Sequence, residues 1–258
     1  MSSEWSAQHF VRFHATVRTI DLVRQLGISG AQRVRRDVAE QIAEYSRMSA
    51  EAEKGSKEYG RATETLDRLT ELADFISSQE SSDFHHLNAQ ALVGVWGVLD
   101  ALVHDLLLAT IDRARHLLKA DITGRMQIKY AEYMSLESDD LAERLLTDIG
   151  RQVSSESKLG VAGFESQLDA FQLSGSVDER VNRVLLEASQ IRNVMVHRSG
   201  IADRRLCRLC PWLDLRPGNP ISVGTGQFTR YLDAIREYVE LLQDRFLQKF
   251  TLGGADPR

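Results

Sequence analysis

Proline is absent from the first 210 residues of this chain, and all four of its prolines lie at or beyond Pro211. A proline inside a helix removes a backbone hydrogen bond and clashes with the preceding turn, so long helices avoid it. The proline-free part is also rich in Ala, Leu, Glu, Arg and Gln, which are common in helices. These two properties predict an all-α protein.

The composition is that of an ordinary soluble globular protein, with 43% hydrophobic and 27% charged residues in a chain of 258. The net charge of −5 gives no overall indication of nucleic-acid binding. The N-terminus lacks a basic stretch followed by an apolar core, and the longest uncharged run, Leu87–Leu99, is too short to span a bilayer. We therefore expect a cytoplasmic protein without membrane contact.

Apolar spacing predicts three charged helices in the N-terminal part, over about 4–26, 31–53 and 57–79. Ser29 and Gly30 are expected to separate the first helix from the second, and the second and third to form a hairpin. The Ser-rich segment at about 77–83 is the best domain boundary. The sequence thus predicts an N-terminal helical extension at 1–80, a helical domain at 81–252 and a disordered tail at 253–258.

The domain at 81–252 is expected to be a helical bundle around one central apolar helix, Asp83–Leu118. Further helices are expected at about 137–152 and 163–173, from the capping box Ser176–Glu179 onward, and at about 227–250. Between the last two, Trp212–Val223 contains a Pro-Gly-Asn turn and resembles a short β-hairpin.

The helix that starts at the Ser176–Glu179 capping box carries a guanidinium, an amide and an imidazole close together, at Arg192, Asn193 and His197. At 100° per residue, Asn193 and His197 share one face, whereas Arg192 lies roughly 140° from His197. One helix therefore cannot direct both groups at a single small atom. A second copy of the helix, crossing the first, would place two Arg and two His around a shared cleft, so the spacing predicts a homodimeric site.

The same helix has an apolar stripe opposite His197, in which residues repeat at steps of four and three: Val177, Val181, Val184, Ala188, Ile191 and Met195. His197 is therefore not expected in the core of its own domain. The face that includes Val194 and His197 is instead expected to lose exposure on dimerisation. Of the acidic residues on the central helix, Asp100 is expected to orient Arg192 or the histidine.

The Arg192-Asn193-x-x-x-His197 pattern near the end of a helix resembles the signature of the HEPN superfamily. Leu87–Asp105 resembles the long first core helix of these small helical domains, and Gly163–Phe171 resembles the short helix ahead of the motif helix. The likeness covers roughly residues 83 to 250 and implies a HEPN-like helical bundle. Many members are metal-independent ribonucleases active as dimers, and some are toxins or phage-defence effectors.

The resemblance implies that Arg192, Asn193 and His197 are catalytic, with Asp100 and Arg198 in support. Metal-free RNA cleavage needs a base for the ribose 2′-hydroxyl, a cation for the phosphate and an acid for the leaving oxygen. Histidine is suited to proton transfer near neutral pH, and the arginine fork binds a phosphate through two hydrogen bonds. The motif is therefore chemically compatible with an endoribonuclease acting on single-stranded RNA.

The segment from Arg192 to Arg216 is locally basic, because it contains six arginines against only Asp203 and Asp214. This excess is either an RNA-facing patch or an ordinary solvated surface. No cofactor or metal is expected: the Cys207-x-x-Cys210 pair has no partner pair, and no Gly-rich phosphate loop precedes a helix.

Two alternatives to a nuclease remain open. The protein is then either a non-catalytic helical module that binds RNA, a nucleotide or a protein through the Arg/His pair, or a scaffold that acts through its N-terminal hairpin. If it is a toxin, an antitoxin or nucleotidyltransferase partner is expected.

Overall fold

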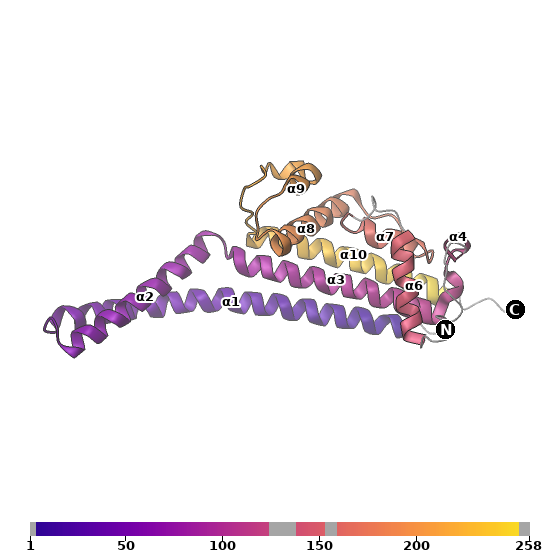
Figure 1. Ribbon diagram of the computed structural model, residues 1–258. Coiled ribbons are helices and arrows are strands. Elements are labelled where there is room, and N and C mark those ends of the chain that lie inside the picture. Colours follow the sequence, from indigo (N-terminus) through magenta and orange to yellow (C-terminus); the bar gives the residue numbers. More distant parts are fainter. Residues whose placement is uncertain (1–3, 124–137, 153–158, 253–258) are drawn as a thin grey trace. The chain divides into compact units, whose positions relative to one another are not determined.

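The computed structural model describes residues 4–123, 138–152 and 159–252, and these are helical almost throughout (Figure 1). In chain order the helices are α1 Glu4–Glu51, α2 Lys57–Ser81, α3 His85–Ala114, the 3₁₀ helix η1 Arg115–Leu117, α4 Ala120–Thr123, α6 Ser138–Gln152, α7 Ala162–Asp169, α8 Glu179–His197, α9 Arg204–Leu209, the 3₁₀ helix η3 Pro211–Leu213 and α10 Thr225–Leu252. Over this part of the chain there is no β-strand, and the all-α prediction is confirmed. The disordered tail expected at 253–258 lies outside the described residues.

The chain forms two compact units. The larger unit comprises Met1–Arg18, Leu92–Ile221 and Thr229–Arg258, and the smaller unit comprises Thr19–Ala91 and Ser222–Phe228. These limits differ from the boundary expected near residue 80, because α1, α3 and α10 each contribute residues to both units.

The core of the larger unit lies where the apolar faces of α3, α8 and α10 are buried. Trp96 of α3, Phe164 of α7 and Tyr238 of α10 form a series of stacked rings, with successive centroids 6.2 and 6.4 Å apart. The fully buried side chains of these helices include Leu99, Leu106, Leu107, Ile111, Tyr231, Tyr238 and Phe246. Large apolar side chains of this kind supply most of the free energy of burial.

A carboxylate on α7 holds this short helix to α10. Glu165 accepts two hydrogen bonds from Arg245 Nη1, at 2.8 and 3.0 Å, and one from the Tyr238 hydroxyl at 2.9 Å. Burial and the adjacent Glu165 raise the pKa of Tyr238 well above its usual value. Glu165 also accepts from the backbone N–H of Gly175, so the segment that leads into α8 is held by the same carboxylate.

The smaller unit has a buried polar contact between α1 and α3. Arg24 Nη1 donates to Asn88 Oδ1 at 2.9 Å, and Asn88, which is fully buried, donates in turn to the carbonyl oxygen of Val223 at 3.1 Å. The Arg24 guanidinium also lies 4.5 Å from the ring centroid of Phe228. Three segments that are distant in sequence are thereby joined by one guanidinium and one amide.

α1 is a single helix, so the break expected at Ser29 and Gly30 is wrong. A Cβ atom at Gly27 would lie 3.2 Å from Leu87 Cδ1, which shows that α1 and α3 approach closely at this glycine. Glycine costs a helix about 1 kcal/mol relative to alanine. That penalty is small beside the tertiary packing that stabilises a long helix, and here the helix continues through both glycines.

The β-hairpin expected at Trp212–Val223 does not form. The segment begins with η3, Asp214 takes a left-handed conformation, and the nearest β-structure is a single antiparallel bridge between Ile201 and Pro220. The physical reason lies in Trp212, whose indole Nε1 donates to Glu187 of α8 at 2.7 Å and draws this part of the chain against the helix.

By length and composition, the segment His85–Leu117 reaches what a membrane-spanning helix needs. The expectation that no run is long enough for a bilayer was therefore too strict. Core helices of soluble proteins meet the same criteria, and half of the most apolar window of this segment is buried inside the protein.

Candidate functional site

α8 carries the candidate motif and is fixed by its buried stripe. The carboxylate of Asp178 caps the helix by accepting from Arg180 N at 2.9 Å and from Val181 N at 3.4 Å. On the inward face, the following side chains are buried: Val181, Val184, Leu185, Ala188, Ile191 and Val194. This burial sets the rotation of α8 and so determines which motif residues reach the surface.

Arg192, one of the two residues that Asp100 was expected to orient, forms an ion pair with Asp100 of α3. Arg192 Nη2 lies 3.7 Å from Asp100 Oδ2, and both side chains are partly accessible to solvent. Arg192 Nη1 also donates to the amide oxygen of its neighbour Asn193 at 3.2 Å. Within the described part of the chain, the buried Arg192 Nε has no hydrogen-bond partner. The guanidinium is thus positioned from two sides and retains donor capacity.

Asp100 sits in a desolvated position for a carboxylate. Burial raises its pKa above the usual value, although the charge of Arg192 and a hydrogen bond from Trp96 act in the opposite direction. The desolvation outweighs the attraction because the Arg192–Asp100 distance is long for an ion pair.

His197 is the last residue of α8, and its side chain is exposed. The expectation that His197 lies outside the core of its own domain is confirmed. Val194 is buried within the unit, with 3% of its surface exposed, so the expectation that Val194 faces a second subunit is wrong. Val196 is the outward apolar residue of this turn, at 48% exposure. The buried face of α8 is wider than the stripe that the spacing of four and three indicated, because it also includes Leu185 and Val194.

The chain turns sharply after His197. Arg198 caps the helix with its backbone N–H donating to Val194 O at 2.9 Å, and its side chain is exposed. Ser199 and Gly200 both have positive φ, at 52° and 76°, and Gly200 N donates to the same Val194 carbonyl at 3.2 Å. A left-handed glycine at this position is the usual way to end a helix.

Beyond this turn, two short stretches of backbone pair and close a loop. Ala202 N donates to Asn219 O and Gly218 N to Ala202 O, both at 2.8 Å, and Ile221 N donates to Gly200 O at 2.8 Å. The enclosed loop contains α9, which packs against α8 (Figure 1). Leu206 of α9 and Cys210, which follows this helix, are both buried. α9 is therefore held at a fixed place beside the motif helix.

Glu187 is the centre of a buried network that joins this loop to α8 and α10, and only 1% of its surface is exposed. Its carboxylate accepts hydrogen bonds from Trp212 Nε1, from Arg230 and, at 2.5 Å, from the Tyr231 hydroxyl. Sequence reasoning missed this residue. A signal was present, because Glu187 directly precedes Ala188 of the apolar stripe and a carboxylate there needs partners.

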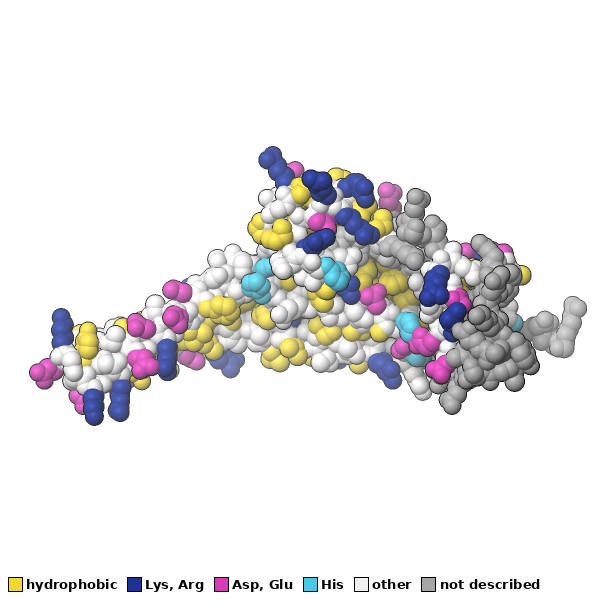
Figure 2. All heavy atoms as spheres, viewed as in Figure 1, with side chains coloured by type: hydrophobic (Ala, Val, Ile, Leu, Met, Phe, Trp, Pro, Cys, Tyr) yellow, Lys and Arg dark blue, Asp and Glu magenta, His cyan; other side chains and the backbone are white. Residues whose placement is uncertain are grey.

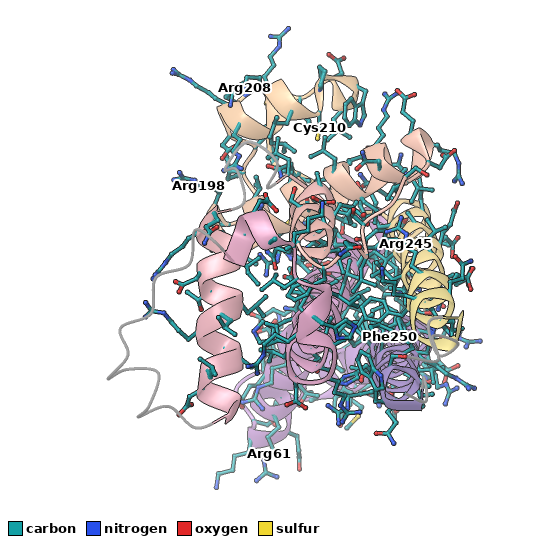
Figure 3. All side chains as sticks on the ribbon, turned by 90° about the vertical axis from the view of Figure 1, so that its right-hand side faces the viewer. Arg61, Arg198, Arg208, Cys210, Arg245 and Phe250 are labelled. Carbon is teal, nitrogen blue, oxygen red and sulfur yellow. The ribbon has the colours of Figure 1, made fainter. Side chains whose placement is uncertain are left out.

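The arginines of this loop are exposed. Figure 2 shows Lys and Arg side chains gathered over the region of α9, and Figure 3 shows that Arg198 and Arg208 project away from the ribbon. Arg204, Arg205 and Arg216 are also exposed. The locally basic segment found in the sequence is thus a solvent-facing surface of the larger unit.

The two cysteines of the loop differ in exposure. Cys210 is buried, and desolvation together with the nearby Glu187 raises its pKa to about 12, whereas Cys207 is half-buried. Among the described residues, no group of three or more His, Cys, Asp or Glu side chains is placed to hold a metal ion.

No family model, no curated protein and no solved structure matches this chain. The support for the candidate site is therefore the geometry of α8, α3 and α9.

Proposed function

We propose that this protein is a metal-independent endoribonuclease of the HEPN type that cleaves single-stranded RNA. The main support is the arrangement at the end of α8: a surface histidine, His197, on the same helix as an arginine, Arg192, that a carboxylate and an amide position. Packing alone does not explain why an exposed imidazole, that of His197, stands at the end of a helix next to a basic loop.

In the proposed reaction, His197 removes the proton of the ribose 2′-hydroxyl, and the 2′-oxygen attacks the adjacent phosphorus. The bond from phosphorus to the 5′-oxygen breaks, and that oxygen takes a proton from a histidine acting as acid. The products are a 2′,3′-cyclic phosphate and a 5′-hydroxyl end. Arg192 binds the phosphate oxygens as charge accumulates on them, and Asn193 holds the guanidinium in place.

The proposed active form is a homodimer, in which each subunit supplies one histidine to a shared cleft. Arg192 and His197 are five positions apart, about 140° around the helix, so a single subunit holds only half of the site. Val196 and Ile201 are large apolar side chains exposed on either side of the turn after α8, at 48% and 42%. They provide apolar surface for a contact between two copies of this end of the helix.

The first experiment is cleavage of single-stranded RNA by the purified protein in EDTA, with analysis of the new ends. We expect cyclic phosphate ends from the wild-type protein and no cleavage by His197→Ala. His116→Ala is the matched control, because His116 is also an exposed histidine and belongs to η1 instead of the motif helix. Cleavage by His197→Ala at the wild-type rate would exclude the proposal.

The dimer is tested by mixing His197→Ala with Arg192→Ala subunits. A shared cleft predicts that activity in the mixture depends on how the chains pair, whereas either variant alone is inactive. A protein that sediments as a monomer and still cleaves RNA at the same concentration would refute the shared site.

As part of the ribonuclease proposal, we also propose that the protein acts in the cytoplasm as a toxin or a phage-defence effector. In that role the partner is an antitoxin, of which a nucleotidyltransferase is one kind. Co-expression is the test: the wild-type chain is expected to stop growth and His197→Ala is not, and co-expressed antitoxin restores growth.

The second candidate function is RNA binding without cleavage. It is favoured by one observation, the exposed arginines of the α9 loop, which serve binding whether or not His197 transfers protons. RNA binding by a wild-type protein that leaves the RNA intact would support this second function over the first.

A further inference from the structure

Three arginines of α9 occupy one side of a short helix, and we name Arg204, Arg205 and Arg208 the arginine platform. All three are exposed, and Leu206 between them is buried. Arg204 and Arg208 are one turn apart, and Arg205 and Arg208 are three residues apart, so the three lie on neighbouring positions of the helix surface. The buried leucine points the opposite way and fixes this orientation.

The guanidinium groups of the arginine platform have no ion-pair partner among the residues that the structure describes. Other arginines of the larger unit are neutralised, such as Arg180 by Glu237 at 3.0 Å and Arg245 by Glu165 at 2.8 Å. The acidic residue at the start of α9, Asp203, is occupied as the helix cap and accepts from Leu206 N at 2.8 Å. The platform thus carries uncompensated positive charge in a protein of net charge −5.

The platform is also held in place relative to the motif. The paired backbone at Ala202 and Asn219, the bond from Trp212 to Glu187 and the buried Cys210 attach the loop to α8. Arg183 lies over the Trp212 ring, 4.3 Å from its centroid, and covers one face of that anchor. Charges fixed in this way lose less conformational freedom on binding than charges on a mobile loop.

We propose that the arginine platform binds the phosphate backbone of single-stranded RNA next to the site at which His197 acts. The inference rests on the proposed function, because it concerns how that site holds its substrate. Guanidinium groups bind phosphate oxygens through paired hydrogen bonds, and a row of them follows a backbone without reading its bases. The platform sets affinity and the direction of the strand, and the chemistry remains with Arg192 and His197.

RNA binding is measured without cleavage, in the His197→Ala background with EDTA present. The probe is a fluorescent oligouridylate of about a dozen nucleotides, a length within the range that single-strand binding surfaces cover. Binding is followed by anisotropy over roughly 50 to 200 mM salt. The test variant adds Arg205→Gln and Arg208→Gln, which remove two charges and retain polar side chains.

The matched control adds Arg33→Gln and Arg36→Gln to the same background. These arginines are also exposed, lie on α1 with the same spacing of three residues, and have no ion-pair partner within the described residues. We expect the platform variant to bind roughly tenfold more weakly, with a salt slope reduced by about 1.4, or about 0.7 for each phosphate that an arginine no longer binds. The control is expected to bind as the background protein does.

Equal effects in the two variants would overturn the inference, because they would show only a general loss of charge. Competition by polyglutamate as effective as that by unlabelled RNA of equal charge would also overturn it, because the surface would then select acidic chains in general. Wild-type cleavage of RNA together with normal binding by the platform variant would reject the inference and leave the proposed function intact. Weakened RNA binding by the platform variant, together with no cleavage of RNA by the wild-type protein, would reject the proposed ribonuclease function and leave the RNA-binding platform intact.

Discussion

Arg192 Nη2 lies 3.7 Å from Asp100 Oδ2, and this ion pair joins the motif helix α8 to the central helix α3. The pair is looser than a direct hydrogen bond, and burial raises the pKa of Asp100 despite its positive neighbour. Asp100 therefore contacts Arg192 in a position where its ionised form is costly in the folded protein.

Replacing Asp100 with asparagine separates stability from activity. Because the pKa of Asp100 is raised in the folded state, its stabilising contribution is present at low pH and is lost as pH rises through that raised value. At pH 7 the ionised carboxylate is a cost that asparagine removes, so we expect the free energy of unfolding of Asp100→Asn to equal or exceed that of the wild type. Its advantage should shrink at pH 4, where the wild-type carboxyl takes up its proton.

The activity of Asp100→Asn should nevertheless fall, because the guanidinium of Arg192 loses the charge that orients it. Urea unfolding at the two pH values gives the stability, and the cleavage rate at saturating RNA gives the activity. If Asp100→Asn were much less stable than the wild type at pH 7, and closer to the wild type in stability at pH 4, this account of Asp100 would be contradicted.

Replacing Glu187 with glutamine should destabilise the larger unit by about 3 kcal/mol, since it removes the charged partner of a buried network. The Trp212 indole, the Tyr231 hydroxyl and Arg230 all donate to this carboxylate. Trp212→Phe should cost only about 1 kcal/mol, because it removes a single hydrogen bond. Urea unfolding measures both changes, and equal losses would show that the carboxylate charge is unimportant.

Replacing Gly30 with alanine tests whether α1 is continuous. A Cβ atom at Gly30 meets nothing within 4 Å in the described part of the chain, so alanine should raise the free energy of unfolding by about 1 kcal/mol. Gly27→Ala should gain less, because the new Cβ would press on Leu87. If the chain turned at Gly30, as its sequence led us to expect, alanine would lower the stability.

The two cysteines should react very differently with a thiol reagent at pH 8. The pKa of Cys210 is raised to about 12, so almost none of its thiol is ionised at that pH, and the side chain is also buried. Cys207 is the accessible thiol. We expect one rapid equivalent of labelling in the native protein and none in Cys207→Ser. Rapid labelling of Cys207→Ser would show that the α9 loop opens readily.

The helices were predictable from sequence because proline placement and apolar spacing act over many residues. The turns were not. Gly30 was taken for a break because a glycine in a helix and a glycine in a turn read alike, and only the close approach of Leu87 near Gly27 shows that this stretch is packed. The β-hairpin at Trp212 failed for a related reason, since a tertiary hydrogen bond to Glu187 overrides the local turn signal.

For the candidate site, the sequence predicted that His197 lies outside the core of its domain and that Asp100 contacts either Arg192 or the histidine, of which the structure shows Arg192. Spacing along one helix was sufficient for the first, and the second needed only a carboxylate on the most apolar helix. Val194 was misplaced because the buried face of α8 is wider than its stripe. The Glu187 network could not be assembled from sequence, because its donors come from positions 25 to 44 residues away.

The paired backbone at Ala202 and Asn219 also bears on proteolysis. Trypsin cleaves after arginine except where proline follows, as Pro217 follows Arg216, so the loop closed by this pairing offers it three exposed arginines within five residues, Arg204, Arg205 and Arg208. A protease must draw an extended stretch of backbone into its own cleft, however, and here that requires unpairing the two stretches and uncovering Leu206 and Cys210. The arginines after which trypsin could cleave this loop are thus carried on a backbone that resists cleavage.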